Sequence, residues 1–414
     1  MIIRDLIVTP IAFRDPPLLN ASGVHEPYAL RTIIRLVVDG GVVGLGEGSG
    51  GAGVIRRLNA LRDSLVGLSV FDLPTIERTV RRVLGDVEPE LSRLEQTRVY
   101  SILDVACHDA QGKLTGRPVV DLLGGAVRDR VPYAAYLFYK WGAHPSADGT
   151  VTYDEWGPAL DPEGIVRQAQ LMTDRYGFRS FKLKGGVFPP AAEVDAVRAL
   201  AEAFPGKPVR IDPNGAWTLE TSIAAAEHLA GSLEYLEDPV LGVDAMAQVA
   251  TATGMPLATN MCVVDFDQIP VAVANAAVQI ILSDHHLWGG MRHTRDLSAI
   301  CETFGIGMSM HSNSHLGISL AAMTHVAAAS PGLTHACDTH YPWNRDDDII
   351  LPGAIDIVDG DVVVPRRPGL GVELDEEALA RQHEVFLSSG IAERDDTTYM
   401  RRFEPDYDPT LPRY

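Results

Sequence analysis

Residues 181–214 read FKLKGGVFPPAAEVDAVRALAEAFPGKPVRIDPN. The stretch begins with a short apolar run that ends at Lys184, continues with a helix-length segment, and returns to an apolar run that ends at Asp212. Alternation of a strand, a helix and a strand is the sequence pattern of a parallel β/α unit. The pattern therefore predicts that the polar residues at both run ends lie at the same edge of a sheet.

The same pattern occurs eight times between residues 126 and 350. From Lys184 onward, successive polar run ends lie 23 to 28 residues apart, which is enough for one strand, one helix and two loops. An open doubly wound sheet could also have this spacing. Eight units with polar residues at nearly every strand end favour a (β/α)8 barrel. The eight runs are VPYAAYLF, FRSFKLK, PVRID, LEYLE, PLATN, VQIILSD, GIGMSMH and LTHACDTH.

The segments on either side of this repeat have a different pattern. Two β-rich runs flank Asp39-Gly40-Gly41, which predicts a hairpin, and residues 54–112 carry apolar side chains at helical spacing. A second hairpin is predicted around Asp359-Gly360, and residues 141–162 are expected to form an irregular insertion. We therefore expect an α+β unit over residues 1–125, a β/α barrel over 126–350, and a C-terminal segment over 351–414 that returns to the first unit.

The composition restricts the class of protein. The chain has 414 residues, of which 46% are hydrophobic and 22% charged, and its formal net charge is −20. Nucleic acids and anionic membrane surfaces both require a basic face, so neither is expected as a partner. The most apolar run, residues 271–282, is interrupted by Asn275 and Gln279 and is too short to span a bilayer.

The cysteines and the N-terminus indicate a cytoplasmic protein. The four cysteines lie far apart and include no C-x-x-C pair, which fits a reducing compartment. The N-terminal sequence MIIRDLIVTPIAFRDPP lacks the basic-then-apolar order of a signal peptide. The cysteines are Cys107, Cys262, Cys301 and Cys337.

Three residues with side-chain oxygens end three consecutive predicted strands. They are Asp212, Glu237 and Asn260, and the catalytic groups of a barrel lie at the carboxyl ends of its strands. Two carboxylates and one amide, with no thiolate or imidazole, suit Mg²⁺ better than zinc. The alternative is that each residue caps the helix that follows it. Helix capping explains any one of them more easily than all three together.

Two further pairs carry acid–base chemistry. Lys182 and Lys184 alternate by two along one predicted strand, so their side chains point to the same face. Two ammonium groups near a metal disfavour each other's charged form, which brings one toward the range of a general base. Asp284 and His311 end neighbouring strands, and a carboxylate beside an imidazole fixes its tautomer and raises its basicity. The alternative for the two lysines is a solvated strand end, and the alternative for His311 is a structural histidine.

A glycine-rich motif lies in the first unit. Gly46-x-Gly48-x-x-Gly51 has the letters of the dinucleotide-binding fingerprint, but it follows a hairpin and does not open a βαβ unit. We interpret these residues as a mobile loop near the site.

At these positions the chain resembles the enolase superfamily, whose members combine an α+β cap with a modified β/α barrel. Within that superfamily it closely resembles the glucarate dehydratases. The resemblance extends from Asn20 to Arg394, and Asn260 is its discriminating feature because most other relatives carry an acid at the third ligand position. The strings that carry it are FKLKGG, DPNGAW, EDP, ATNM and HSNSHLGISLAAMTHVAAA.

The resemblance implies a fold, a cofactor and a partner. The fold would be a modified (β/α)8 TIM barrel of the enolase type, with a capping domain formed by the N-terminal segment and the C-terminal tail. Mg²⁺ would be held by Asp212, Glu237 and Asn260. We expect a small-molecule acid-sugar substrate and a homo-oligomer.

The resemblance also implies roles for individual residues. Lys184 would be one base for the α-proton, and His311, paired with Asp284, would be the base on the opposite face. Lys182 and Asn214 would steady the enediolate. Contacts with the substrate are implied for Asn20, His25, Tyr136, Phe138, His340 and Arg394, the last as a partner for a carboxylate.

The implied reaction is the dehydration of an acid sugar, with D-glucarate as the first candidate. Dehydration or epimerisation of another aldarate, such as galactarate, is an alternative, and so is a weakly active or silent paralogue that binds acid sugars. Three departures from the family pattern bear on the identity of the diacid. The family's threonine contact has no clear match, with only Thr97 nearby, His285 stands where relatives often have proline, and Ser314 stands where they often have asparagine.

Overall fold

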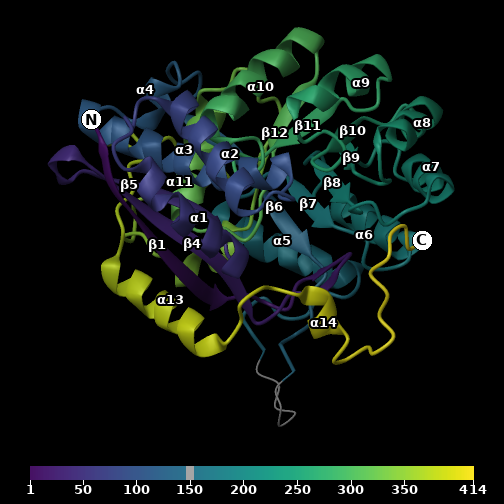
Figure 1. Cartoon of the computed structure of the whole chain (residues 1–414). Coiled ribbons are helices and arrows are strands. Elements are labelled where there is room, and N and C mark those ends of the chain that lie inside the picture. The colour runs from purple at the N-terminus through teal and green to yellow at the C-terminus, as the bar shows by residue number, and fades with distance from the viewer. Residues whose placement is uncertain (146–152) are drawn as a thin grey trace.

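The structure is a computed structural model that describes residues 1–145 and 153–414. An N-terminal unit of strands and helices lies beside a ring of parallel strands surrounded by helices (Figure 1). The insertion expected at residues 141–162 lies partly outside the described residues. No helix in the described ranges is long and apolar enough to cross a membrane.

The N-terminal unit is built on a three-stranded antiparallel sheet with the order β1-β4-β5. The predicted hairpin is confirmed: β4 and β5 pair antiparallel, and the turn between them is the 3-10 helix η1 (Asp39–Gly41). Helices α1, α2 and α3 bury their apolar faces in a core shared with the sheet. The elements are β1 (Ile3–Arg14), the two-residue strands β2 (Leu19–Asn20) and β3 (Gly23–Val24), β4 (Tyr28–Val38), β5 (Val43–Ser49), α1 (Ala52–Leu65), α2 (Leu73–Val87), α3 (Arg93–Thr115) and α4 (Val119–Leu122).

Strand β5 packs directly on helix α3. A methyl group at Gly46 would overlap the carbonyl oxygen of Ile102 in α3, and one at Gly48 would overlap the Ile102 side chain. Glycine is required there because the strand and the helix approach so closely. Gly46 and Gly48 therefore belong to a packed strand, and their interpretation as a loop is wrong. Gly51, with a φ of 113°, is the residue that turns the chain into α1.

The predicted β/α barrel is confirmed. Strands β6 to β12 pair in parallel in chain order, and β13 pairs in parallel with β6. An isolated parallel bridge between Met308 and Leu333 links β12 to the segment that precedes β13. The eight strands are β6 (Arg130–Phe138), β7 (Phe181–Lys184), β8 (Val209–Asp212), β9 (Tyr235–Glu237), β10 (Leu257–Thr259), β11 (Ile280–Ser283), β12 (Gly307–Met310) and β13 (Cys337–Thr339).

Helices separate these strands, and their ends carry local signals. Helix α5 begins after Asp161, whose side chain accepts a hydrogen bond from Gly164 N at 2.7 Å, and it ends at Gly177 with a φ of 72°. Helix α11 is buried along its whole length. The helices are α5 (Pro162–Tyr176), α6 (Pro190–Ala203), α7 (Leu219–His228), α8 (Val243–Thr253), η2 (Phe266–Gln268), α9 (Ile269–Ala274), α10 (Gly290–Phe304), α11 (Gly317–Ala328), α12 (Tyr341–Asn344) and η3 (Arg345–Asp347).

The C-terminal segment contacts both units. The hairpin predicted at Asp359-Gly360 is present as β14 (Ile357–Val358) and β15 (Asp361–Val363), but β15 pairs with barrel strand β6 rather than with the N-terminal sheet. Helix α13 (Glu376–Ser389) lies along β1, where His383 Nδ1 is 2.7 Å from the Pro10 carbonyl oxygen (Figure 1). The short helix α14 (Asp396–Met400) follows it beside β3.

Candidate active site

A cavity of about 650 Å³ lies where the carboxyl ends of the barrel strands face the N-terminal unit and the residues before α14. Ten of the fourteen residues predicted for the site line its wall. Lys182, Asp212, Glu237 and Asp284 do not line it and are buried behind it. The ten that line it are Asn20, His25, Tyr136, Phe138, Lys184, Asn214, Asn260, His311, His340 and Arg394.

Lys182 lies at the bottom of the site and is fully buried. Its Nζ is 2.7 Å from Glu237 Oε1 and 2.6 Å from Asp338 Oδ2, so it donates to carboxylates on two strands. Burial opposes the charge on this amine, but the carboxylates of Asp338 and Glu237 outweigh it and raise the pKa of Lys182 well above its usual range. The neighbouring carboxylates therefore favour the charged form of Lys182.

Lys184 lies closer to the cavity than Lys182 does. Its Nζ donates to Asp212 Oδ2 at 2.7 Å and to Asn214 Oδ1 at 2.6 Å. Burial lowers the pKa of Lys184, but the Asp212 carboxylate reverses this, so the pKa lies above its usual range. The effect of two adjacent lysines near a metal stays a prediction, because the carboxylates dominate the surroundings of both lysines in this structure.

The three predicted ligands fit a divalent cation. Asn260 Oδ1 is buried and accepts no hydrogen bond from the described residues, which is costly unless a cation is its partner. Burial, together with the carboxylates of Asp212 and Asp338, raises the pKa of Glu237 well above its usual range. Four buried carboxyl groups surround two ammonium groups, and a divalent cation would balance the excess negative charge. The six groups are Asp212, Glu237, Asp238, Asp338, Lys182 and Lys184.

Asp238 orients the third predicted ligand. Its Oδ2 accepts from Asn260 N at 2.7 Å and its Oδ1 from Thr259 Oγ1 at 2.5 Å. The backbone of Asp238 has a φ of 35°, in the left-handed region, so the residues around it hold it in a conformation that non-glycine residues seldom adopt. The arrangement fixes the end of β10 against the end of β9.

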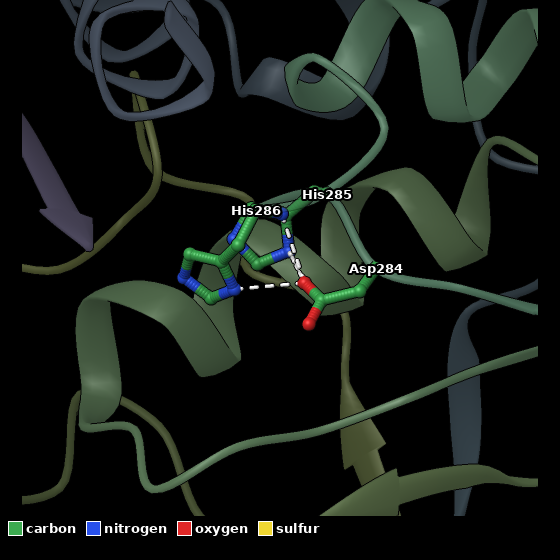
Figure 2. A group of neighbouring side chains, drawn as sticks. All are labelled: Asp284, His285 and His286. Carbon is green, nitrogen blue, oxygen red and sulfur yellow. Dashed lines mark hydrogen bonds and ion pairs between the residues drawn. The ribbon is translucent and has the colours of Figure 1, made fainter. Parts of the chain in front are cut away.

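His311 faces the cavity from the end of β12 and is paired as predicted. Its Nδ1 is 3.3 Å from Asp284 Oδ2. Burial raises the pKa of Asp284, but His286 and His311 more than compensate and hold it well below its usual range. Figure 2 shows that His286 also points to this carboxylate, with Nδ1 2.8 Å from Asp284 Oδ1. The Asp284 carboxylate is therefore shared between two imidazoles.

Aromatic side chains form one wall of the cavity. The rings of Tyr136 and His340 meet edge to face with centroids 4.7 Å apart, and Phe138 lies 5.2 Å from His340. The Lys182 ammonium lies 4.8 Å from the centroid of the Tyr136 ring. Burial holds the pKa of His340 well below its usual range, so this imidazole is neutral.

The residues predicted to contact substrate from the N-terminal and C-terminal segments line the cavity on another side. Asn20 Oδ1 accepts from Ser22 N at 2.7 Å, which shapes the turn between β2 and β3. His25 Nδ1 is 3.1 Å from Asp15 Oδ2. The guanidinium of Arg394 is bound to two carboxylates, with Nη1 2.6 Å from Asp15 Oδ2 and Nε 2.7 Å from Asp396 Oδ1. Its charge is thus balanced within the protein.

Sequence reasoning missed several residues of this site. Asp338 ends the eighth apolar run, so the strand-end rule could have found it as a partner of Lys182. His286 and Arg31 also line the cavity, with Arg31 Nη2 3.1 Å from His286 Nε2. No local sequence pattern joins those two residues, which are 255 positions apart.

Two families match this chain. Residues 5–124 match the N-terminal domain of the mandelate racemase / muconate lactonizing enzyme family, and residues 164–378 match the enolase C-terminal domain-like family. The chain is 52% identical to the probable glucarate dehydratase of Streptomyces coelicolor, over 99% of this chain and 100% of that protein. It is 29% identical to muconate cycloisomerase 1 of Rhodococcus opacus, over 84% of this chain and 89% of that protein.

Solved structures agree with these matches. The crystal structure of an enolase from Thermobispora bispora, complexed with magnesium and formate, has a TM-score of 0.96 and 53% identity over the whole of both chains. An enolase from Pseudomonas fluorescens with bound magnesium, potassium and tartrate has a TM-score of 0.95 and 50% identity, over 100% of this chain and 99% of that chain. The chain therefore belongs to the enolase superfamily, with the N-terminal domain of the mandelate racemases and muconate lactonizing enzymes.

Proposed function

We propose that this chain is a Mg²⁺-dependent hydro-lyase that dehydrates acid sugars, and that D-glucarate is its substrate. The observation that carries the proposal is the arrangement of Lys184 and His311, two groups able to move protons, on one cavity beside Asn260. The similarity to the probable glucarate dehydratase supports the reaction, and the bound tartrate of the Pseudomonas fluorescens structure supports a hydroxy diacid as ligand.

Asp212, Glu237 and Asn260 would hold the metal ion. When bound, Mg²⁺ supplies positive charge that makes the proton α to a substrate carboxylate more acidic. The two carboxylates and the unpartnered amide oxygen are the hard oxygen donors that this ion prefers.

The first chemical step is removal of the α-proton. A cation bound by Asp212 would withdraw the carboxylate that favours the charged form of Lys184, so that Lys184 would act as the neutral base on one face. His311 is the base on the other face, and the proton passes to the nitrogen of whichever base the configuration of the α-carbon presents. The electron pair of the C–H bond moves into an enediolate. His311 Nδ1 is committed to Asp284, so Nε2 is the nitrogen of His311 that remains for the substrate.

The second step is loss of the β-hydroxyl. The C–O bond breaks as the enediolate collapses, and His311 Nε2–H supplies the proton that converts the leaving hydroxyl into water. When His311 is the base this is the proton that it removed from the α-carbon, and when Lys184 is the base His311 carries the proton from the start. The resulting enol loses its hydroxyl proton to solvent, takes up a proton at the former β-carbon, and becomes a keto-deoxy acid. General acid–base catalysis of this kind typically contributes about 10²–10⁴-fold.

Most of the remaining rate enhancement must come from stabilising the enediolate charge. The ammonium of Lys182 donates to Glu237 and Asp338, which favour its charged form, and it lies 4.8 Å from the centroid of the Tyr136 ring on the cavity wall. Asn214 lies on the cavity wall, with its Oδ1 accepting from Lys184. Both groups are fixed by the protein before the substrate arrives, which is what electrostatic stabilisation requires.

Two other outcomes of the same chemistry are kept as alternatives. With a base on each face, the enzyme could epimerise an aldarate at the α-carbon, or it could dehydrate another diacid such as galactarate. A weakly active or silent acid-sugar binder is the third possibility. Asn260 Oδ1 is available for a metal ion, and His311 keeps its Asp284 partner. Both observations favour an active enzyme over a silent binder.

The test is the formation of keto acid from a panel of acid sugars that includes D-glucarate and galactarate, with Mg²⁺ and with EDTA. Metal-dependent product from D-glucarate is the expected result. The matched variant is Asn260→Leu, which should lose Mg²⁺ binding in calorimetry as well as activity. Product from galactarate alone would mean that galactarate, and not D-glucarate, is the substrate. If no acid sugar gave a metal-dependent product, the proposed reaction would be refuted.

A further inference from the structure

His286 joins the Asp284–His311 pair to the N-terminal unit. Asp284 Oδ1 accepts from both His286 N and His286 Nδ1, each at 2.8 Å, and Figure 2 shows the two side chains facing each other. Asp284 Oδ2 faces His311 Nδ1 at 3.3 Å. On its other edge, His286 Nε2 lies 3.1 Å from Arg31 Nη2 and 2.9 Å from Ser319 Oγ. One imidazole thus connects a barrel strand end to strand β4.

These contacts determine where the proton of His286 lies. A carboxylate only accepts hydrogen bonds, so the nitrogen that faces Asp284, Nδ1, carries hydrogen. A guanidinium only donates, so the nitrogen that faces Arg31, Nε2, is an acceptor. The Ser319 hydroxyl, 2.9 Å from Nε2, can donate to this nitrogen as Arg31 does, whereas a doubly protonated ring would set an N–H against the N–H groups of Arg31 at 3.1 Å. His286 is therefore neutral, with its hydrogen on Nδ1.

Arg31 is itself held in place. Its Nε donates to Glu47 Oε1 at 2.9 Å, and both side chains are buried. Glu47 Oε1 also accepts from Leu316 N, and Oε2 accepts from Ser319 N, each at 2.8 Å. Although burial opposes it, Arg31 keeps the pKa of Glu47 below its usual range, so the pair stays charged. The N-terminal unit thereby presents a fixed donor to His286.

We propose that Arg31 and His286 are positioning residues that set the tautomer and orientation of the His311 base through Asp284. Because His286 is neutral, Asp284 keeps its full negative charge for His311 Nδ1–H, and His311 Nε2 remains free to accept a proton from the substrate. The inference rests on the proposed function of His311. In addition, His311 is held in the correct orientation only when β4 and β5, which carry Arg31 and Glu47, are docked on the barrel.

The base on the other face has different support. Lys184 donates to Asp212 and Asn214, and neither of these residues forms a hydrogen bond with His286 or Arg31 in the part of the chain that the structure describes. Loss of His286 should therefore weaken proton transfer at the His311 face and spare the Lys184 face. A purely structural role for His286 would weaken both faces together.

The experiment measures exchange of the α-proton with D₂O by NMR, using D-glucarate and its epimer at the reacting α-carbon. His311→Asn first identifies which exchange depends on His311. His286→Leu should then slow that exchange by about 10–100-fold, the loss typical when a hydrogen-bond partner that orients a metal-binding histidine is removed. The other exchange should stay within about threefold of the wild-type rate. His286→Asn, which keeps a donor toward Asp284, should lie between wild type and His286→Leu.

Equal loss in both exchanges, or no loss in a folded variant, would overturn the inference. A second measurement does not depend on turnover: the ¹⁵N chemical shifts of His286 in histidine-labelled protein, assigned with His286→Asn. The Nδ1–H tautomer at pH 7 is expected, and an imidazolium pattern would overturn the inference. Absence of exchange from both epimers in the wild type, with the neutral tautomer present, would count against the proposed function instead.

Discussion

Lys184 and His311 face the same cavity from strands β7 and β12, but their surroundings differ. Lys184 lies among charges, 2.7 Å from Asp212, in a cluster where carboxyl groups outnumber ammonium groups. His311 lies at the end of a hydrogen-bonded series in which a neutral imidazole, His286, shares the Asp284 carboxylate. The lysine face therefore depends on charge balance, and hence on a divalent cation. The histidine face depends on hydrogen-bond geometry and on docking of the N-terminal unit.

The sharpest way to separate the two faces is to remove each base. Lys184→Met and His311→Asn should each lower exchange of the α-proton by about 10²–10⁴-fold, but from opposite epimers, because each base serves one face. His311→Asn should also stop dehydration, since the leaving hydroxyl loses its acid. Exchange is followed by NMR in D₂O and dehydration by keto-acid formation. If both variants lost the same exchange, the two-face arrangement would be wrong.

Lys182→Met tests what the two faces share. Lys182 is expected to stabilise the enediolate and not to remove a proton, so both exchanges and the dehydration rate should fall together. The expected loss in kcat is about 10²–10³-fold, as for other single donors to a developing oxyanion. Steady-state kinetics with saturating Mg²⁺ measures it. A variant with near wild-type kcat would contradict this role.

Arg98 and Arg394 allow a comparison of two cations on the cavity wall. Arg394 is bound by Asp15 and Asp396, whereas Arg98, exposed on α3, forms no ion pair within the described ranges. The second carboxylate of a diacid needs a cation, and Arg98 is available for it. Arg98→Gln should raise KM for the diacid about tenfold with little change in kcat, consistent with loss of an exposed charge-assisted hydrogen bond.

The control for Arg98 is Arg93→Gln, because Arg93 lies on the same helix and has Asp265 and Asp267 as its ion-pair partners. This variant should keep the wild-type KM. A mono-acid sugar should bind wild type and Arg98→Gln equally. If Arg98→Gln bound the diacid normally, the second carboxylate would have to be bound elsewhere, with Arg394 as the next candidate.

The smallest effect on turnover is expected from substitution of His285. Its ring lies against the ring of His286, with centroids 3.9 Å apart, but it lacks the hydrogen bonds that His286 makes. Neither ring nitrogen of His285 has a hydrogen-bond partner among residues 1–145 and 153–414, and burial holds the pKa of His285 well below its usual range. The unfolded chain binds a proton at His285 below about pH 6.5, but the folded protein does not. The unfolding free energy should therefore fall by up to about 1.4 kcal/mol per pH unit below pH 6.5.

His285→Leu removes this contribution. Chemical denaturation at pH 7.5 and pH 5.0 should show that the variant loses less stability on acidification than the wild type. Parallel losses in the two proteins would mean that His285 is protonated in the folded state. The difference between the two pH values is the relevant quantity, because it cancels the change in packing.

The sequence predicted the barrel and most of the cavity wall for a physical reason. Strand ends and helix lengths are local properties, so the positions of Asp212, Glu237 and Asn260 follow from the repeat alone. The parallel topology then brings their side chains to one edge, and pairing Asp284 with His311 needed only that β11 and β12 be neighbours.

The tertiary structure decided what local patterns do not contain. Lys182 meets Asp338 across 156 residues, and His286 meets Arg31 across 255, through contacts that depend on closure of the barrel and on docking of the N-terminal unit. The same holds for Gly46, which became part of a packed strand only because α3 covers β5. The charge states of the lysines and histidines likewise depend on burial and on distant neighbours. The sequence thus determined which reactive groups gather at the strand ends, while the tertiary structure decided how each one is charged and aimed, since electrostatics and hydrogen bonding act through space and not along the chain.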